Sequence, residues 1–215
     1  MTSTTPPRKS RRGFRQRGMA WLLASNGERM HRMFGATKAH LLAPLSGSVL
    51  ELGPGAGANF RYFQAGVQWA GVEPNEHNLP PLRAEAARFG VAADVRLGYA
   101  EALPYPDDSL DNVVTTLVLC SVDDVRRTLE EVRRVLKPGG SYVFLEHVAA
   151  PQGSLSRMAQ DLLTPLWGLL ADGCHPNREL AEAIAAAGFD PVELERFDVF
   201  LPLVRPHIAG IVQKP

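Results

Sequence analysis

The stretch Val49-Leu-Glu-Leu-Gly-Pro-Gly-Ala-Gly-Ala-Asn-Phe60 decides the fold. A short, mostly apolar run leads directly into three glycines at alternate positions, Gly53, Gly55 and Gly57. This pattern is typical of a buried strand followed by a tight turn, because glycine adopts backbone conformations that other residues avoid. Amides exposed at such a turn can meet a charged or carbonyl group of a ligand. The stretch therefore predicts a strand over Ser48–Leu52 with a ligand-binding loop at its carboxyl end.

The chain beyond this stretch alternates between strand-like and helix-like segments, which predicts a mostly parallel sheet with helices on both faces. After helices over 154–171 and 177–187, two strands follow with no helix between them, so they must be able to pair antiparallel. We therefore expect a doubly wound, Rossmann-like α/β fold, with a seven-stranded, mostly parallel sheet and an antiparallel last strand. The other expected strands are 67–72, 94–97, 112–119, 141–147, 192–199 and 208–213, and the other expected helices are 59–65, 79–89 and 125–136.

An acidic residue, Glu73, closes the expected second strand twenty residues beyond Gly53. An acid at this place can accept hydrogen bonds from ribose hydroxyls, so the ligand is predicted to be of the nucleoside type. Gly53, Gly55 and Ala58 also satisfy the dinucleotide pattern G-x-G-x-x-G/A, which keeps a nicotinamide-dependent reductase as an alternative. Glu51 favours a ligand without phosphate, because its charge would repel a pyrophosphate but could pair with an ammonium. S-adenosyl-L-methionine carries an ammonium and a sulfonium and has no phosphate.

These features together resemble the class I S-adenosylmethionine-dependent methyltransferases over about residues 45–213. The resemblance also rests on Ala100-Glu101 and on the turn Leu136-Lys-Pro-Gly-Gly140. It implies that the glycine loop holds the methionine end of the cofactor, that Glu73 takes the ribose hydroxyls, and that 98–101 lies beside the adenine. The implied cofactor-binding residues are Glu51, Gly53, Pro54, Gly55, Gly57, Asn59, Phe60, Glu73, Pro74, Ala100, Glu101, Leu119 and Cys120.

The second half of the chain is similar to the methyltransferase-like seven group, in Thr116-Leu-Val-Leu-Cys-Ser-Val122, Glu146-His-Val-Ala-Ala150, Leu166-Trp-Gly-Leu-Leu-Ala-Asp-Gly-Cys174 and Leu203-Val-Arg-Pro-His-Ile-Ala-Gly210. Animal members of that group are alkyl thiol methyltransferases associated with membranes and lipid droplets. The resemblance implies a methyltransferase that acts on a small molecule, preferably a lipophilic thiol. The alternative is O- or N-methylation of a small phenolic metabolite or a lipid amine.

The acceptor pocket is expected beyond the carboxyl ends of the fourth and fifth strands, where doubly wound sheets bind their ligands. A thiol is already a few per cent thiolate at pH 7, so it needs no strong base. An alcohol or a phenol would need one, and His147 at the end of the fifth strand is the best candidate. The other interpretation of His147 is a histidine bonded to backbone.

The chain has two cysteines, Cys120 and Cys174, which we expect to pack as small apolar side chains. No pair among His147, His175, Asp172 and Cys174 has a recognised zinc spacing, so we expect no metal. Two cysteines in 215 residues fit a reducing compartment.

The net charge of zero hides an asymmetry, because residues 1–17 hold six of the 23 basic residues and no acid. We expect a disordered basic arm over 1–13, a helical lid over 14–45, and a methyltransferase domain over 46–215. The arm could make a weak peripheral contact with an anionic membrane, and the acidic remainder argues against a nucleic-acid substrate. We expect a cytoplasmic protein that can also bind peripherally to a membrane. The sequence predicts no particular oligomeric state.

Overall fold

The computed structural model describes residues 17–18, 25, 27–171, 173–201 and 203–215. The basic arm, most of the lid before residue 27, and Asp172 lie outside these residues, so the expectations for them stay predictions. None of the described helices has the length and apolar character needed to cross a membrane.

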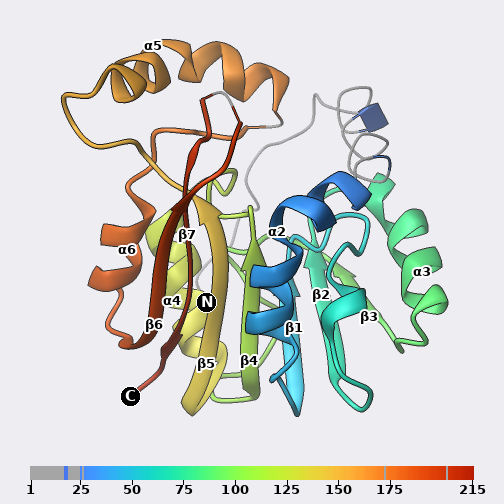
Figure 1. The fold of residues 1–215 in the computed structure, drawn as a ribbon. Helices are drawn as coiled ribbons and strands as arrows, with labels where there is room; N and C mark the ends of the chain where they lie inside the picture. Colours follow the sequence, from blue (N-terminus) through green and yellow to red (C-terminus); the bar gives the residue numbers. More distant parts are fainter. Residues whose placement is uncertain (1–16, 19–24, 26, 172, 202) are drawn as a thin grey trace, which may run out of the picture.

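A seven-stranded sheet forms the centre of the protein (Figure 1), with the strand order β3-β2-β1-β4-β5-β7-β6. Strands β1 to β5 pair parallel, whereas β7 pairs antiparallel with both β5 and β6. The mixed, mostly parallel sheet predicted from the sequence is therefore confirmed. The strands are β1 (Ser48–Leu52), β2 (Gln68–Glu73), β3 (Asp94–Leu97), β4 (Leu110–Thr116), β5 (Leu136–His147), β6 (Asp190–Asp198) and β7 (Pro206–Gln213).

Helices cover both faces of the sheet, and alternate strand residues supply the two halves of the core. In β1, Val49 packs on the side of α2 (Gly27–Leu42) and α3 (Leu79–Arg88). Its neighbour Leu50 packs on the side of α4 (Val125–Val135) and α6 (Leu180–Ala186). The period of two along a strand thus produces two apolar layers, which fix the sheet and the loops at its edge.

Helix α5 (Leu155–Leu170) differs from the others because it lies beyond the sheet, above β6 and β7 in Figure 1. Its one buried residue is Gln160, whose side chain accepts a hydrogen bond from Ala150 N and donates one to Leu203 O. These bonds hold the helix across the end of the sheet. The remaining surface of the helix is unusually apolar, with more than half of the side chain exposed at Leu155, Met158, Leu162, Leu166, Leu169 and Leu170.

Four predicted elements differ from the structure by three residues or more. Strand β5 begins at Leu136, five residues before the predicted start at 141, so the segment 136–140, which was predicted to be a turn, forms the first part of that strand. The expected helix over 59–65 is wrong: only a 3-10 turn, Phe60–Tyr62, forms there. Asn59 makes no capping hydrogen bond, because its side chain donates to the carboxylate of the buried Glu51 instead. Strand β4 ends at Thr116, three residues earlier than expected, because Leu117 takes a positive φ of 58°. Helix α6 begins three residues later than the predicted 177, at Leu180.

Candidate active site

The glycine loop after β1 has the backbone conformation that its sequence predicts. Gly53, Gly55 and Gly57 all have positive φ values, of 58°, 57° and 84°. A Cβ atom at Gly57 would lie 2.6 Å from the ring of Phe60, and one at Gly53 would lie 3.0 Å from Val118. Side chains are therefore excluded at these two glycines by both backbone conformation and space.

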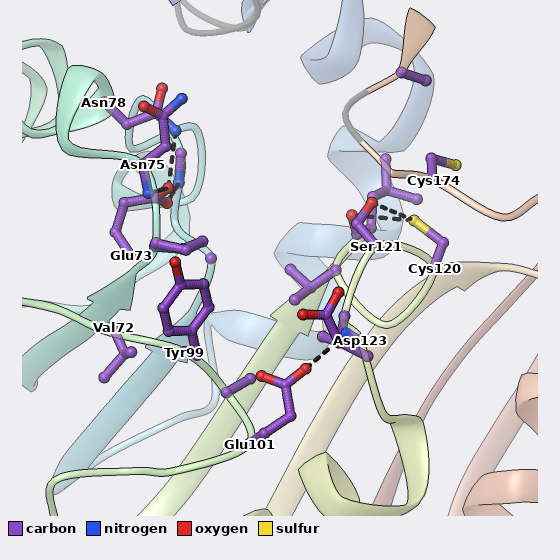
Figure 2. Close-up of a pocket in the computed structure, with 18 of the residues that line it drawn as sticks. Val72, Glu73, Asn75, Asn78, Tyr99, Glu101, Cys120, Ser121, Asp123 and Cys174 are labelled. Carbon is purple, nitrogen blue, oxygen red and sulfur yellow. Dashed lines mark hydrogen bonds between the residues drawn. The ribbon is translucent and has the colours of Figure 1, made fainter. Parts of the chain in front are cut away.

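Glu73 holds the glycine loop from the end of β2. Its carboxylate is buried and accepts hydrogen bonds from Gly55 N (3.0 Å), Asn75 N (2.9 Å) and the side chain of Asn78 (3.0 Å). Figure 2 shows Glu73 beside Asn75 and Asn78 on one side of the cavity. The acid that was predicted to bind ribose thus also orders the loop that was predicted to bind the methionine end.

A second buried acid, Glu51, lies beneath this loop. It accepts hydrogen bonds from Asn59 Nδ2 (2.8 Å) and Trp69 Nε1 (3.0 Å). Burial raises the pKa of Glu51 to about 7, although these hydrogen bonds and the charge of Lys38 oppose the shift. Lys38 is itself buried in α2, and burial lowers its pKa to about 8. Glu51 therefore supports the loop through its hydrogen bond with Asn59. A direct contact between Glu51 and a cofactor stays a prediction.

A cavity of about 350 Å³ lies at the carboxyl ends of β1, β2, β4 and β5. Its volume falls in the range of small-molecule sites, roughly 300–1,000 Å³. The predicted residues that line it are Gly53, Gly55, Glu73, Pro74, Ala100, Glu101, Cys120 and His147. Six predicted cofactor-binding residues do not line the cavity, so within it they can only support the residues that do. They are Glu51, Pro54, Gly57, Asn59, Phe60 and Leu119.

The segment predicted to lie beside the adenine forms one wall of the cavity, with Tyr99 and Glu101 facing it. Glu101 accepts hydrogen bonds from Asp123 N (2.7 Å) and Asp124 N (3.3 Å), just before α4 begins. Glu101 thus links this wall to the loop after β4. Sequence reasoning missed Asn75 and Asn78, whose signal was their closeness to Glu73.

The far end of the cavity, which we call the acceptor end, contains Cys120, His147 and Cys174. His147 Nε2 lies 3.1 Å from Cys174 Sγ, and Trp167 Nε1 donates to the same sulfur at 3.4 Å. Hydrogen bonds from the Cys120 thiol and from His147 lower the pKa of Cys174, against the effect of its burial. Both cysteines are buried, as an apolar packing role requires, but they also contact polar groups, which that role does not explain.

The walls of the acceptor end are apolar. Trp167, which lies near the end of α5, forms part of the wall of the cavity. Its neighbours in the wall come from the loop after β4, from the end of α5 and from the loop before β7. They are Leu117, Val118, Val122, Ala171 and Val204.

His147 is well placed to face an acceptor but is not organised as a base. Its Nδ1 atom is buried and has no hydrogen-bond partner among the residues that the structure describes. The carboxylate of the preceding residue, Glu146, accepts a hydrogen bond from Val118 N at 2.9 Å. Burial raises the pKa of Glu146 to about 7. His175 does not belong to the cluster that Cys120, His147 and Cys174 form. A catalytic role for His147 therefore stays a prediction.

The site fits S-adenosyl-L-methionine on its own geometry. Gly53 and Gly55, which carry no side chain, leave room for a ligand to lie close to the backbone, and Glu73 brings a carboxylate to the same end of the cavity. A doubly wound sheet with this loop after β1, an acid after β2 and an antiparallel β7 defines a class I S-adenosylmethionine-dependent methyltransferase.

Comparisons with known proteins agree with this class, since the family described as "Methyltransferase domain" matches residues 50–144. The chain belongs to the thiol S-methyltransferase family, which confirms the resemblance to the methyltransferase-like seven group. It is 43% identical over 170 residues to thiol S-methyltransferase TMT1B of Rattus norvegicus, covering 76% of this chain and 69% of the relative. It is 40% identical over 177 residues to TMT1A of Homo sapiens, covering 78% and 70%.

A solved structure supports the fold independently of sequence. Geranyl diphosphate C-methyltransferase from Streptomyces coelicolor, in complex with S-adenosyl-L-homocysteine, superposes with a TM-score of 0.66 at 15% identity. The match covers 86% of this chain and 80% of that one.

Proposed function

We propose that this methyltransferase transfers a methyl group to the sulfur of a small lipophilic thiol. The observation that carries the proposal is the acceptor end of the cavity, where an apolar wall of Trp167, Ala171 and Val204 surrounds two sulfur atoms and an imidazole. Apolar pockets with few polar groups favour lipophilic ligands. The names of the relatives TMT1A and TMT1B support the same acceptor chemistry.

The residues at the two ends of the cavity have different roles, one end in binding the cofactor and the other in positioning the acceptor. S-adenosyl-L-methionine supplies a methyl group that its sulfonium makes electrophilic. The glycine loop and Glu73 would hold that cofactor, while the walls of the acceptor end would exclude water and aim the acceptor sulfur along the line of displacement. A thiol that is partly ionised at neutral pH needs alignment more than it needs a base. This suits a site in which His147 has no orienting carboxylate among the described residues.

The test measures transfer of a labelled methyl group from S-adenosyl-L-methionine to matched acceptors. Each aliphatic or aromatic thiol is paired with the alcohol or phenol of the same carbon skeleton, and lipid amines form a third set. We expect the thiols to be methylated, with kcat/KM rising as the chain becomes more lipophilic. Phenols or amines that outcompete every thiol at equal concentration would replace this proposal with O- or N-methylation.

We also propose that the protein is cytoplasmic and touches membranes only weakly, without a nucleic-acid substrate. The support is the basic character of residues 1–17 and the exposed leucines of α5 beside the acceptor end. Binding to anionic vesicles that disappears at high salt would assign the contact to the basic arm, because salt screens exposed charges. Binding that persists at high salt would assign it to α5, and a chain that never binds vesicles would contradict the proposal.

A further inference from the structure

Three side chains that are far apart in the sequence meet at the acceptor end. Cys120 follows β4, His147 ends β5, and Cys174 follows α5. The two Sγ atoms and a ring nitrogen of His147 all lie within 4.8 Å of one another, and all three residues are buried. All three also line the cavity, so their ligand atoms share one enclosed space with the acceptor.

We propose that Cys120, His147 and Cys174 bind a thiophilic divalent cation of the Zn²⁺ type, with the fourth coordination position open to the cavity. Two thiolates and one imidazole form a soft donor set, which selects Zn²⁺ over Mg²⁺ or Ca²⁺. Three protein ligands and one open position are the arrangement of catalytic rather than structural zinc sites. The ligands show no recognised zinc spacing along the chain, because they come from the end of one strand and from two separate loops.

The distances are close to those of a tetrahedral site. Zn–S bonds of about 2.3 Å and Zn–N bonds of about 2.0–2.1 Å place tetrahedral ligand atoms roughly 3.5–3.8 Å apart. His147 Nε2 and Cys174 Sγ are 3.1 Å apart, and no pair in the cluster exceeds 4.8 Å. The distances between the ligand atoms therefore need to change only slightly for the cluster to surround a cation.

Hydrogen bonds hold the two cysteine loops in place. The carbonyl oxygen of Cys120 accepts from His175 N at 2.8 Å, which joins the loop after β4 to the loop after α5. Arg178 donates to two further carbonyl oxygens of the Cys120 loop. Trp167 Nε1 donates to Cys174 Sγ. Such outer hydrogen bonds orient metal ligands and tune them.

The imidazole is oriented as a ligand. Nε2 is the nitrogen that faces Cys174, while Nδ1 of His147 is buried without a hydrogen-bond partner in the described part of the chain. A histidine that serves as a general base is normally held at its other nitrogen by a carboxylate, as in the serine protease triad. A metal-bound imidazole is normally held at its other nitrogen too, so the unbonded Nδ1 does not separate the two roles. The ligand role rests instead on the 3.1 Å between Nε2 and Cys174 Sγ and on the nearby Sγ of Cys120.

The acceptor thiol would take the fourth position, and this part of the inference rests on the proposed function. On binding, the thiol gives its proton to bulk water and its sulfur stays in the cavity as a thiolate. After methylation the sulfur is a neutral thioether, a weaker ligand, so the product leaves. No oxidant or reductant is involved.

Cobalt(II) is the probe for the site, because thiolate ligands give it strong charge-transfer absorption. The full-length protein is treated with a chelator and titrated with Co²⁺, and we expect one Co²⁺ per chain. Cys120→Ser and Cys174→Ser should each remove about half of the charge-transfer absorbance, because each removes one of two thiolates. His147→Gln should weaken Co²⁺ binding by more than the roughly 10- to 100-fold that loss of an outer partner of a ligand costs, because it removes a direct ligand.

His175→Gln is the matched control, since it removes an imidazole next to Cys174 that lies outside the cluster. Its Co²⁺ spectrum should equal that of the unmodified chain. The thermal shift caused by S-adenosyl-L-methionine checks that each variant is folded. A chain that binds no Co²⁺, or cysteine variants that keep the full spectrum, would overturn the site.

Addition of a thiol should then strengthen the charge-transfer band, because a third thiolate joins the cation, and the matched alcohol should not. An unchanged spectrum would overturn the open fourth position. The two proposals fail separately: a protein that binds no Co²⁺ but methylates thiols overturns the cation site alone. A protein that binds Co²⁺ but methylates no thiol overturns the proposed function alone.

Discussion

The two ends of the cavity are built in different ways. The cofactor end consists of a strand, a glycine loop and the carboxylate of Glu73, all within about 25 residues of one another. The acceptor end consists of an apolar wall and of Cys120, His147 and Cys174, which come from the loop after β4, the end of β5 and the loop after α5. One end is therefore specified by local sequence and the other by the topology of the sheet.

This difference explains why the two ends can vary independently. The cofactor end depends on hydrogen bonds to charged groups and on glycines for which no other residue substitutes, so changes there are expected to be costly. The acceptor end depends on the shape of an apolar wall and on a few soft atoms. Changes there are expected to alter which acceptor reacts, while cofactor binding persists.

The largest effect is expected at the cofactor end. Glu73→Ala removes a carboxylate that accepts a hydrogen bond from Gly55 N and lines the cavity, and hydrogen bonds to charged groups contribute about 1.5–3 kcal/mol each. We expect the affinity for S-adenosyl-L-methionine, measured by calorimetry, to fall roughly 10- to 150-fold. The exposed Glu76→Ala, on the turn that follows, is the control. Unchanged affinity in a folded Glu73→Ala protein would contradict the assignment of this end.

A smaller effect is expected when the wall of the acceptor end is cut back. Trp167→Ala should lower kcat/KM for a lipophilic thiol roughly tenfold, since apolar pocket contacts discriminate by about 1–3 kcal/mol. Affinity for S-adenosyl-L-methionine should stay within about twofold. Phe200→Ala is the control, because Phe200 is 99% exposed and does not line the cavity. Equal losses in both variants would mean that Trp167 acts only through general surface hydrophobicity.

A change near the amino end of β4, away from the carboxyl ends of the strands, should affect neither end of the cavity. Asp111 accepts hydrogen bonds from Lys137 and Ser48, which lower its pKa to about 2 from the usual 3.8. Its contribution to stability is present above pH 3.8 and is lost as the pH falls through about 2. Asp111→Asn should therefore lower the free energy of unfolding at pH 7 by about 1 kcal/mol or less, with the difference from the unmodified chain shrinking in acid. Urea melts at pH 7 and at about pH 2 measure it, and a constant difference would refute the pairing.

The smallest effect is expected at the basic arm. Removal of residues 1–12 should leave kcat/KM for a water-soluble thiol within about twofold, because this segment has no apolar periodicity to bury. Steady-state assays of the shortened and full chains make the comparison. A large fall in turnover would instead make the arm part of the active site.

The local patterns of the chain predicted the fold well and the acceptor end poorly. The apolar run Ser48–Leu52 and the strand Asp94–Leu97 were predicted to the residue. Asp124, which directly precedes the helix predicted over 125–136, caps α4 by accepting a hydrogen bond from Arg127 N. These elements depend on neighbours in the sequence, and the propensities of such neighbours can be read directly.

The failures come from contacts between distant residues. Asn59 was predicted to begin a helix, but its side-chain amide donates hydrogen bonds to Glu51 and Thr116 across the loop. Cys120 and Cys174 looked like separate apolar side chains, because only the order of the strands brings them to one cavity. No local signal in the sequence contains that information.

The position of β7 between β5 and β6 also governs how the chain can fold while it is being made. β6 pairs only with β7, so it has no partner in the sheet until residues 206–213 exist. The free edge of β5 must stay unpaired on that side while residues 148–205 leave the ribosome. At about 5–20 residues per second, this interval lasts roughly 3–12 s. During translation that edge is the part of the nascent chain most open to chaperones and to pairing with another strand.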